Sequence, residues 1–200
     1  MKKSNIVVPL IIGEAIALIF LAVSVSLKLP EIVEEWKKYF PIVFPILSLG
    51  GVFVAYLLGK KIPVLFQLAK FVLVGALNTF VDLGVLNLLM FVFNVFSGVL
   101  YTFFKAFSFI CSVVNSYFWN KFWTYEQKKT GVKGKEFGKF FLIAGTGFFL
   151  NVAIASFVVN IIGPQFGFSA ELWGNIGAII ATICVFMWNF LGYKFLVFKK

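Results

Sequence analysis

Six apolar runs, each about as long as a helix needs to cross a lipid bilayer, dominate this sequence. Spanning about 30 Å of hydrocarbon takes about 20 apolar residues, and a backbone in lipid must satisfy its own hydrogen bonds. The period-2 alternation of a barrel strand is absent, so helices are expected. The runs cover Ile6–Leu27, Phe40–Leu58, Phe71–Val92, Val99–Trp119, Phe140–Ile162 and Leu172–Val197. We therefore predict an all-α integral membrane protein of about six transmembrane helices.

The composition excludes several classes of function. The chain is 61% hydrophobic and 13% charged, which a soluble domain of 200 residues could not bury. It has no histidine and two isolated cysteines, Cys111 and Cys184, so no disulfide framework is expected, nor any metal site or cofactor. The sequence contains no P-loop and no paired carboxylates outside the membrane, so we do not expect an enzyme. The net charge of +10 comes from lysine alone, and in so apolar a chain it indicates cytoplasmic loops and anionic lipid rather than nucleic acid.

The lysines predict the orientation of the chain. Basic residues gather in cytoplasmic loops, and here they gather at both termini and after the second and fourth runs. The intervening segment Pro30–Lys38 carries Glu31, Glu34 and Glu35, and is either a short surface helix or a solvated loop. We expect both termini in the cytoplasm and the protein in the cell membrane. A signal peptide is less favoured, because the first run is too long and contains Glu14. The lysines on the cytoplasmic side are Lys2, Lys3, Lys60, Lys61, Lys70, Lys121, Lys128, Lys129, Lys133, Lys135, Lys139, Lys194, Lys199 and Lys200.

The chain from Gln67 onward contains an internal repeat. A shift of 69 residues aligns the start of the two halves, and a shift of 73 aligns their ends. Each half is a helical hairpin that leaves the cytoplasm and returns, so the repeats share one orientation. The segment Lys121–Lys139, with three glycines, is expected to be a flexible basic linker. The matched pairs include Lys70 with Lys139, Asp82 with Asn151, Cys111 with Cys184, and Lys121 with Lys194.

Two segments resemble the GtrA-like family. One is Lys70-Phe-Val-Leu-Val-Gly-Ala-Leu-Asn78-Thr-Phe-Val-Asp82, and the other is Asn115-Ser-Tyr-Phe-Trp-Asn120-Lys121-Phe-Trp-Thr-Tyr125. A weaker echo of the second segment begins at Asn189. The resemblance divides the chain into an extra membrane hairpin, residues 1–66, and a four-helix domain, residues 67–200. Two departures are the extra hairpin itself and a lysine after Asn120, where arginine is common in the family.

The resemblance implies a function and partners. Such proteins are thought to move polyprenyl-phosphate-linked sugars across the membrane for polysaccharide or teichoic acid glycosylation. The resemblance also implies a membrane-associated glycosyltransferase as a partner, and a related domain anchors some dolichol-phosphate-mannose synthases. The alternative is therefore an anchor or regulatory subunit that moves nothing. A small-solute exporter is a third reading, which the same-orientation repeat disfavours. Self-association into a homo-oligomer is left open.

Three charged residues within the predicted helices are candidates for the transport path: Glu14, Asp82 and Lys105. Each costs at least ~2.5–3.5 kcal/mol at the bilayer centre, so each should face protein or water. At 1.5 Å per residue, Asp82 lies about 18 Å from Lys70 and Lys105 about 24 Å from Lys121, close enough in depth to pair. Glu14 could neutralise Lys105 instead, or be protonated, because burial disfavours a charged carboxyl.

The other candidate site residues fall into three sets. With Asp82 and Lys105, amides would line a polar track for the sugar; a structural role in helix packing is the alternative. Lysines at repeat-equivalent helix ends would bind the phosphate, unless they only mark topology. Aromatic residues beside them would stack on sugar or form an interface belt. The amides are Asn78, Asn151, Asn115, Asn120 and Asn189; the lysines are Lys70, Lys121, Lys139 and Lys194; the aromatic residues are Trp119, Trp123, Tyr117 and Tyr125.

Overall fold

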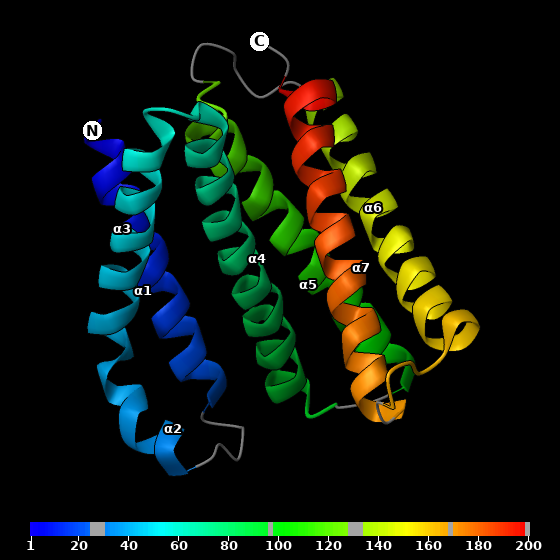
Figure 1. The fold of residues 1–200 in the computed structure, drawn as a ribbon. Helices are drawn as coiled ribbons and strands as arrows, with labels where there is room; N and C mark the ends of the chain where they lie inside the picture. The colour runs from blue at the N-terminus through cyan, green and yellow to red at the C-terminus, as the bar shows by residue number, and fades with distance from the viewer. Residues whose placement is uncertain (25–30, 96–97, 128–133, 168–169, 199–200) are drawn as a thin grey trace. The chain divides into compact units, whose positions relative to one another are not determined.

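The chain folds into helices throughout the part that the computed structural model describes, which is residues 1–24, 31–95, 98–127, 134–167 and 170–198. The all-α fold is confirmed (Figure 1). The chain divides into two compact units, Met1–Gln127 and Lys128–Lys200. The first unit contains α1 Ser4–Ser24, α2 Glu31–Trp36, η1 Lys37–Tyr39, α3 Phe40–Gly59, α4 Pro63–Phe93, α5 Gly98–Trp119 and the π-helical turn η2 Asn120–Thr124. The second contains α6 Gly134–Ser156, η3 Phe157–Ile162, α7 Ala170–Gly192 and η4 Tyr193–Val197.

The long helices correspond to the six apolar runs. Within the described residues, three helical stretches have the length and apolarity to cross a membrane: Ser4–Ser24, Glu31–Gly59 and Pro63–Phe93. The helices α5, α6 and α7 have 22, 23 and 23 residues, which at 1.5 Å per residue is about the thickness of the hydrocarbon core. The protein is an all-α membrane protein.

The start of α4 differs from the prediction. We expected a link up to Lys70, but α4 already begins at Pro63. Proline suits the first turn of a helix, because its missing N–H would be unpaired there anyway. The same helix ends at Asn94, whose φ of 50° is the left-handed cap that asparagine tolerates. Lys70 therefore lies within the body of α4 and not at its end.

The expected flexible linker is also shorter than predicted. Residues Asn120–Thr124 form η2, and α6 begins at Gly134, so both ends of the predicted segment are helical. Glycines near the start of a helix do not prevent helix formation when the residues that follow pack against a neighbouring helix. The middle of the predicted linker, residues 128–133, lies outside the described residues.

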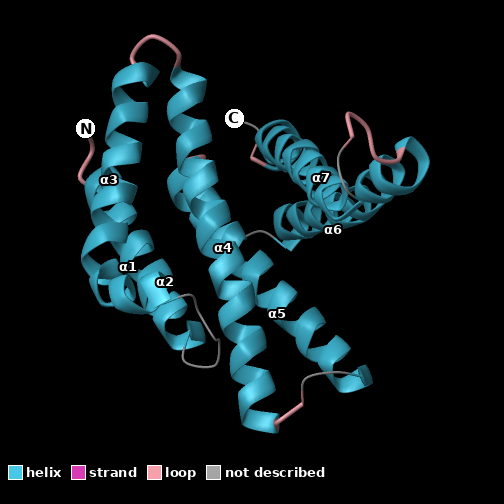
Figure 2. Cartoon of the chain, turned by 60° about the horizontal axis from the view of Figure 1, so that its bottom comes forward, coloured by secondary structure: helices cyan, strands magenta, loops and turns pink. Residues whose placement is uncertain are grey.

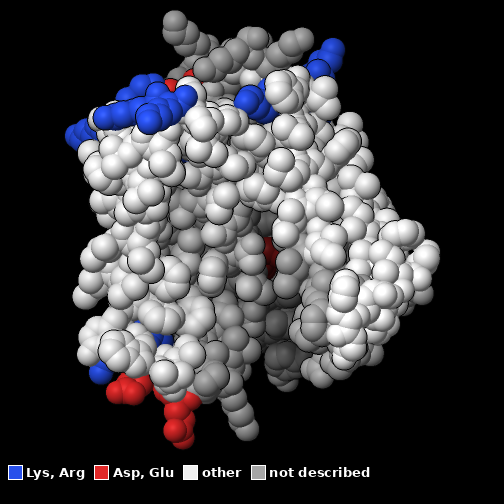
Figure 3. Space-filling model, viewed as in Figure 1, with Lys and Arg blue, Asp and Glu red and all other residues white. Residues whose placement is uncertain are grey.

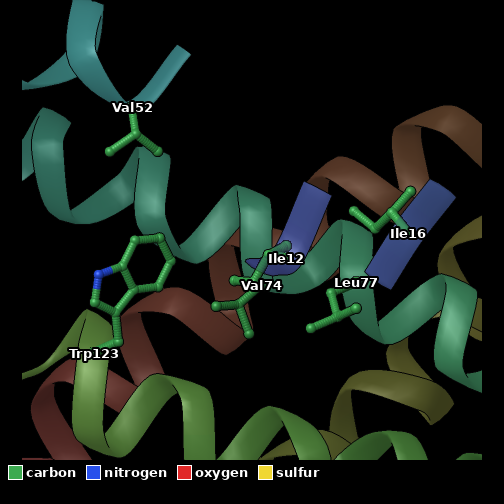
Figure 4. Close-up of a cluster of buried hydrophobic side chains, with 6 residues drawn as sticks. All are labelled: Ile12, Ile16, Val52, Val74, Leu77 and Trp123. Atoms are coloured by element: carbon green, nitrogen blue, oxygen red, sulfur yellow. The ribbon is translucent and has the colours of Figure 1, made fainter. Parts of the chain in front are cut away.

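The first unit packs the N-terminal hairpin against α4. The core cluster takes Ile12 and Ile16 from α1, Val74 and Leu77 from α4, with Val52 of α3 and Trp123 of η2 completing it (Figure 4). Helices α1, α3 and α4 contact one another, and α5 packs against α4 (Figure 2). The N-terminal hairpin of α1 and α3 lies before the predicted domain boundary at residue 66. It nevertheless belongs to the same compact unit as the first repeat.

Charge is segregated between the two ends of the first unit. Lysine side chains gather at the end that carries the N-terminus and the α3–α4 turn, while acidic side chains gather at the opposite end, near α2 (Figure 3). The short helix α2 shows that the segment between the first two runs is helical, one of the two alternatives left open. Its Glu34 pairs with Lys37 on the surface.

The second unit is a two-helix hairpin with one tightly packed end. Phe140 of α6 stacks on Tyr193 of η4, with ring centroids 3.9 Å apart, and also contacts Phe198. Gly192 lies so close to Ile143 that an added Cβ would come within 2.9 Å of its side chain. Aromatic stacking and a glycine contact therefore hold the start of α6 against the end of α7.

The two repeats end in the same local structure. The π-helical turns η2 and η4 cover Asn120–Thr124 and Tyr193–Val197, which are related by the shift of 73 residues found in the sequence. The cap hydrogen bonds match too, with a distance of 2.8 Å both from Tyr125 N to Asn120 O and from Phe198 N to Tyr193 O. Single-turn π-helices are rare and often occur at functional sites. The repeat seen in the sequence is thus matched by a shared backbone feature.

Candidate lipid-sugar site

Asp82 and Ser108 form the innermost described contact of the candidate site. The Ser108 hydroxyl, fully buried on α5, donates a 2.6 Å hydrogen bond to the Asp82 carboxylate on α4. Asp82 lies twelve residues beyond Lys70, about 18 Å along the helix. Ser108 was not predicted as a site residue. The sequence feature that could have identified Ser108 is its spacing from Asn115. The two polar residues are seven positions apart on α5 and so share one helical face.

A second polar contact lies one turn along the same pair of helices. The side-chain amide of Asn115 donates to the Asn78 carbonyl oxygen at 2.7 Å, and the Trp119 indole donates to Asn115 at 3.1 Å. The structure thus brings together three of the predicted residues, and Asp82 follows Asn78 by four positions on the same face of α4. We call the set Asp82, Ser108, Asn78, Asn115 and Trp119 the polar line.

Two predicted members of the track cannot be placed against Asp82. The side chain of Lys105 lies outside the described residues, so the pairing of Asp82 with Lys105 stays a prediction. Asn151 lies in α6, in the second unit, where its side chain is half-buried. Its expected position at the depth of Asp82 also stays a prediction.

Lys70 is buried under aromatic rings. Its side chain is 2% exposed, and its ammonium group lies 4.5 Å from the ring centroid of Phe66 and 5.5 Å from that of Trp123. It also donates to the Trp123 carbonyl oxygen at 3.4 Å and to Glu126 at 3.2 Å. The burial of an ammonium group is costly unless its charge is compensated, and these contacts compensate it.

Glu126 joins Lys70 to the N-terminus. It lies two residues after the end of η2 and pairs with both Lys70 and Lys2. Partial burial acts to raise the pKa of Glu126, but the hydrogen bonds and charges of Lys2 and Lys70 outweigh burial and lower that pKa overall. Sequence reasoning missed Glu126. Its signal was an acidic residue immediately after the second motif, within a strongly basic stretch.

Lys121 and Lys194 occupy equivalent places in the two repeats. The fully buried Lys121 lies 5.5 Å from the ring centroid of Tyr117, whose hydroxyl accepts its hydrogen bond at 3.3 Å. The half-buried Lys194 lies 5.8 Å from the ring centroid of Phe190, also four residues before it. Lys139 is exposed on α6. The expected ring of four lysines draws on both units, so it stays a prediction.

The predicted sugar-stacking residues lie mostly inside the protein. Tyr117 is 0% exposed, and Trp123 and Tyr125 are each 3% exposed. The Trp123 indole donates to Asn5 of α1 at 3.1 Å, which ties it to the N-terminal hairpin. Trp119 is half-buried within the polar line. In this conformation the buried rings offer no open face to a sugar or to the membrane interface.

Three buried polar oxygens in the described residues have no hydrogen-bond partner: Asn120 Oδ1, Thr124 Oγ1 and Asn189 Oδ1. The Asn120 amide nitrogen is used locally, because it donates to the Ser116 carbonyl at 2.9 Å. Asn189 lies against Gly147, where an added Cβ would come within 2.8 Å of its Oδ1. Asn120 and Asn189 were predicted to bind substrate, and each keeps an oxygen that can accept a hydrogen bond from a donor such as a hydroxyl.

Comparison with known proteins identifies the family. The model of the GtrA/DPMS transmembrane domain matches residues 70–198, so it includes the polar line, Lys70, Lys121 and both π-helical turns at the ends of the repeats. No curated protein matches the chain. No solved structure matches it either. The match covers well over half of the chain and confirms the resemblance drawn from the two motifs. The chain belongs to the GtrA/DPMS transmembrane-domain family.

Proposed function

We propose that this protein moves a polyprenyl-phosphate-linked sugar from the cytoplasmic to the outer leaflet of the cell membrane. The family relates the chain to sugar-lipid translocation. The sugar would serve cell-surface polysaccharide or teichoic acid glycosylation. The protein then acts as a transporter and not as an enzyme, because no covalent bond needs to change when a lipid-linked sugar crosses the bilayer.

The polar line is the observation that carries this proposal. It places a carboxylate, a hydroxyl, two amides and an indole at the contact between two largely apolar helices, α4 and α5. Polar groups within a membrane domain are costly and commonly mark a substrate path. A sugar must exchange hydrogen bonds with water for hydrogen bonds with protein when it crosses, and the polar line supplies acceptors and donors for that exchange. An anchor needs none of them.

The basic end of the first unit is the proposed site for the phosphate. Lys70, Lys121, Lys139 and Lys194 are all candidates, and Lys70 and Lys121 are buried lysines with aromatic neighbours. A lipid phosphate would compete with Glu126 for Lys70, because both are anions. The gathering of lysines at the end of the first unit that carries the N-terminus supports the proposal that the N-terminus faces the cytoplasm.

An anchor or regulatory subunit for a glycosyltransferase is the second candidate function. The family model covers DPMS membrane domains as well as GtrA proteins, which favours this reading. In that case the basic end would contact the enzyme or anionic lipid, and the polar line would only fix the packing of α4 against α5. The two functions differ in whether substrate movement depends on the polar line.

The test is a transbilayer assay with the purified full chain in liposomes. The probe is fluorescently labelled polyprenyl-phosphate glucose, and a membrane-impermeant quencher reports the fraction in the outer leaflet. We expect wild-type protein to accelerate exchange at least tenfold over empty liposomes. Asp82→Asn and Ser108→Ala, which keep the shape of the site, should each slow exchange about tenfold, or ~1.4 kcal/mol in barrier height.

Thr79→Ala is the matched control for the transbilayer assay. Thr79 is also a polar residue of α4, but it bonds only the carbonyl of Gly75 on its own helix and is exposed to lipid. It should leave exchange unchanged. Folded wild-type protein that does not accelerate exchange, together with glycosyltransferase activity that depends on its presence, would favour the anchor function instead.

A further inference from the structure

Glu14 lies at the middle of helix α1, where its side chain is half-buried. It is ten residues from each end of α1, so about 15 Å from either end. Ile12 and Ile16 point toward α4 in the core cluster (Figure 4). Because each residue turns the helix by 100°, Glu14 lies about 200° from both and so projects away from α4. The family model does not cover this helix.

A groove between α1 and α3 opens beside Glu14. Its volume is about 590 Å³, and its walls are otherwise apolar. The two helices approach closely at Gly13, where an added Cβ would lie 2.6 Å from the Phe44 carbonyl oxygen and from Pro45 Cα. The groove therefore lies beside a close crossing of α1 and α3. The lining residues are Leu10, Ile11, Glu14, Ala15, Leu18, Pro41 and Pro45.

The polar atoms of the groove are hydrogen-bond acceptors. Pro45 lies within α3 and has no N–H, so it cannot bond the carbonyl of Pro41, four residues earlier. Pro41 and Glu14 both line the groove. Neither that carbonyl nor the Glu14 carboxylate can donate a proton while Glu14 is charged. The groove therefore suits an occupant that is cationic or rich in hydrogen-bond donors.

Nothing in the described part of the chain neutralises Glu14. No ion pair or hydrogen bond reaches it there. The helix α3 carries no charged residue, and the charged residues of α4, Lys70 and Asp82, belong to a helix on the opposite side of α1 from Glu14. A charge at this depth costs at least ~2.5–3.5 kcal/mol on the insertion scale unless a partner compensates it.

We propose that this groove docks a transmembrane helix of a partner protein that carries a lysine or arginine near its midpoint. The charge decides the occupant. A cation in the groove would neutralise Glu14, whereas a second copy of this chain docked face to face would bring two carboxylates together. The apolar walls would pack against the partner helix, as helix pairs do in membranes. This inference does not rest on the transport function, because the groove lies outside the family domain.

The test measures binding of model helices to the full chain in liposomes. The probes are two 22-residue leucine-alanine helices, one with lysine and one with leucine at the midpoint, each with an acceptor dye at one end. The donor dye is attached to a cysteine placed at Lys61, with Cys111 and Cys184 replaced by alanine. We expect energy transfer to show the lysine helix binding about tenfold more tightly than the leucine helix.

Two variants locate the effect at Glu14. Glu14→Gln keeps the size of the side chain and should remove the preference for the lysine helix. Glu31→Gln, which removes a carboxylate of α2 outside the groove, should leave that preference intact. Glu14→Lys should instead prefer a helix with glutamate at its midpoint, and this reversal separates charge recognition from misfolding.

The opposite outcomes would overturn the proposal. Equal binding of the two helices to wild-type protein would show that Glu14 does not recognise a cation in the groove. Energy transfer between copies of this chain that Glu14→Gln abolishes would make a second copy the occupant. Loss of transbilayer exchange in the same variants would not bear on docking, because the exchange assay contains no partner helix.

Discussion

The carboxylate of Glu126 lies 3.2 Å from the ammonium group of Lys70, a side chain that is only 2% exposed. The same carboxylate also pairs with Lys2, at the start of the chain. Glu126 thus joins the N-terminal segment, helix α4 and the end of the first repeat. Together with the Asn5–Trp123 hydrogen bond, it ties the extra hairpin to the family domain.

Replacing Glu126 with glutamine should destabilise the protein near neutral pH. The change leaves the buried Lys70 charge without its anion. We expect a loss of ~1–2 kcal/mol in the free energy of unfolding, between the values for exposed and for buried pairs. Chemical denaturation in detergent micelles would measure it. Glu34→Gln is the control, because Glu34 pairs with Lys37 on the surface of α2 and should contribute at most a few tenths of a kcal/mol.

The contribution of Glu126 should also depend on pH. A carboxyl whose pKa is lowered on folding adds stability that is fully present above its unfolded pKa, near 4.5, and is lost as the pH falls through its lower folded pKa. The stability difference between wild-type protein and Glu126→Gln should therefore stay constant above about pH 5.5 and shrink below about pH 4.5. A difference that grows on acidification would contradict the ion pair with Lys70.

The Asn78–Asn115 hydrogen bond should stabilise the contact between α4 and α5. A double-mutant cycle of Asn78→Ala and Asn115→Ala should give a coupling energy of ~0.6–1.7 kcal/mol, the range for hydrogen bonds between membrane helices. Asn87→Ala serves as the control partner, because the Asn87 amide bonds only the Leu83 carbonyl of its own helix. Zero coupling between Asn78 and Asn115 would mean that the two amides act independently.

Gly13→Ala should weaken the packing of α1 against α3. The added Cβ would meet the backbone of Phe44 and Pro45 at 2.6 Å, so one helix must shift. We expect a loss of ~1–3 kcal/mol, as for other overpacked contacts. Gly51→Ala is the matched control on α3, because an added Cβ there meets nothing within 4 Å. Thermal unfolding of both variants in the same detergent would compare them, and equal stabilities would contradict the close crossing at Gly13.

The proposed orientation predicts opposite labelling of two segments. In a chain with Cys111 and Cys184 replaced, a cysteine at Glu34 should react with an impermeant thiol reagent from outside the cell. A cysteine at Lys135 should react only after the membrane is opened. The reason is the lysine asymmetry, since basic segments stay on the cytoplasmic side. Labelling of both positions from one side would reject the six-span topology.

The sequence by itself determined the helices, the repeat and the family. Lipid leaves a spanning backbone no other hydrogen-bond partners, so apolar runs of sufficient length predict helices whose ends agree with the structure within a few residues at most positions. The exceptions were the start of α4 at Pro63, the π-helical turn η2 and the start of α6 at Gly134, where local backbone bonding extends the helix into a polar stretch. Residue spacing also placed Asn78 and Asp82 on one face of the same helix.

The tertiary structure alone decided which polar residues meet. Hydropathy records the cost of a buried lysine but not its partner, so it could not connect Lys70 to Glu126, 56 positions later. It could not show that Trp123 and Tyr125 lie inside the protein, because an aromatic residue near a helix end suits a core as well as a membrane interface. Nor could it show that Glu14 opens into a groove, since the direction of a side chain in a helix that is apolar all round depends on which neighbours pack against it.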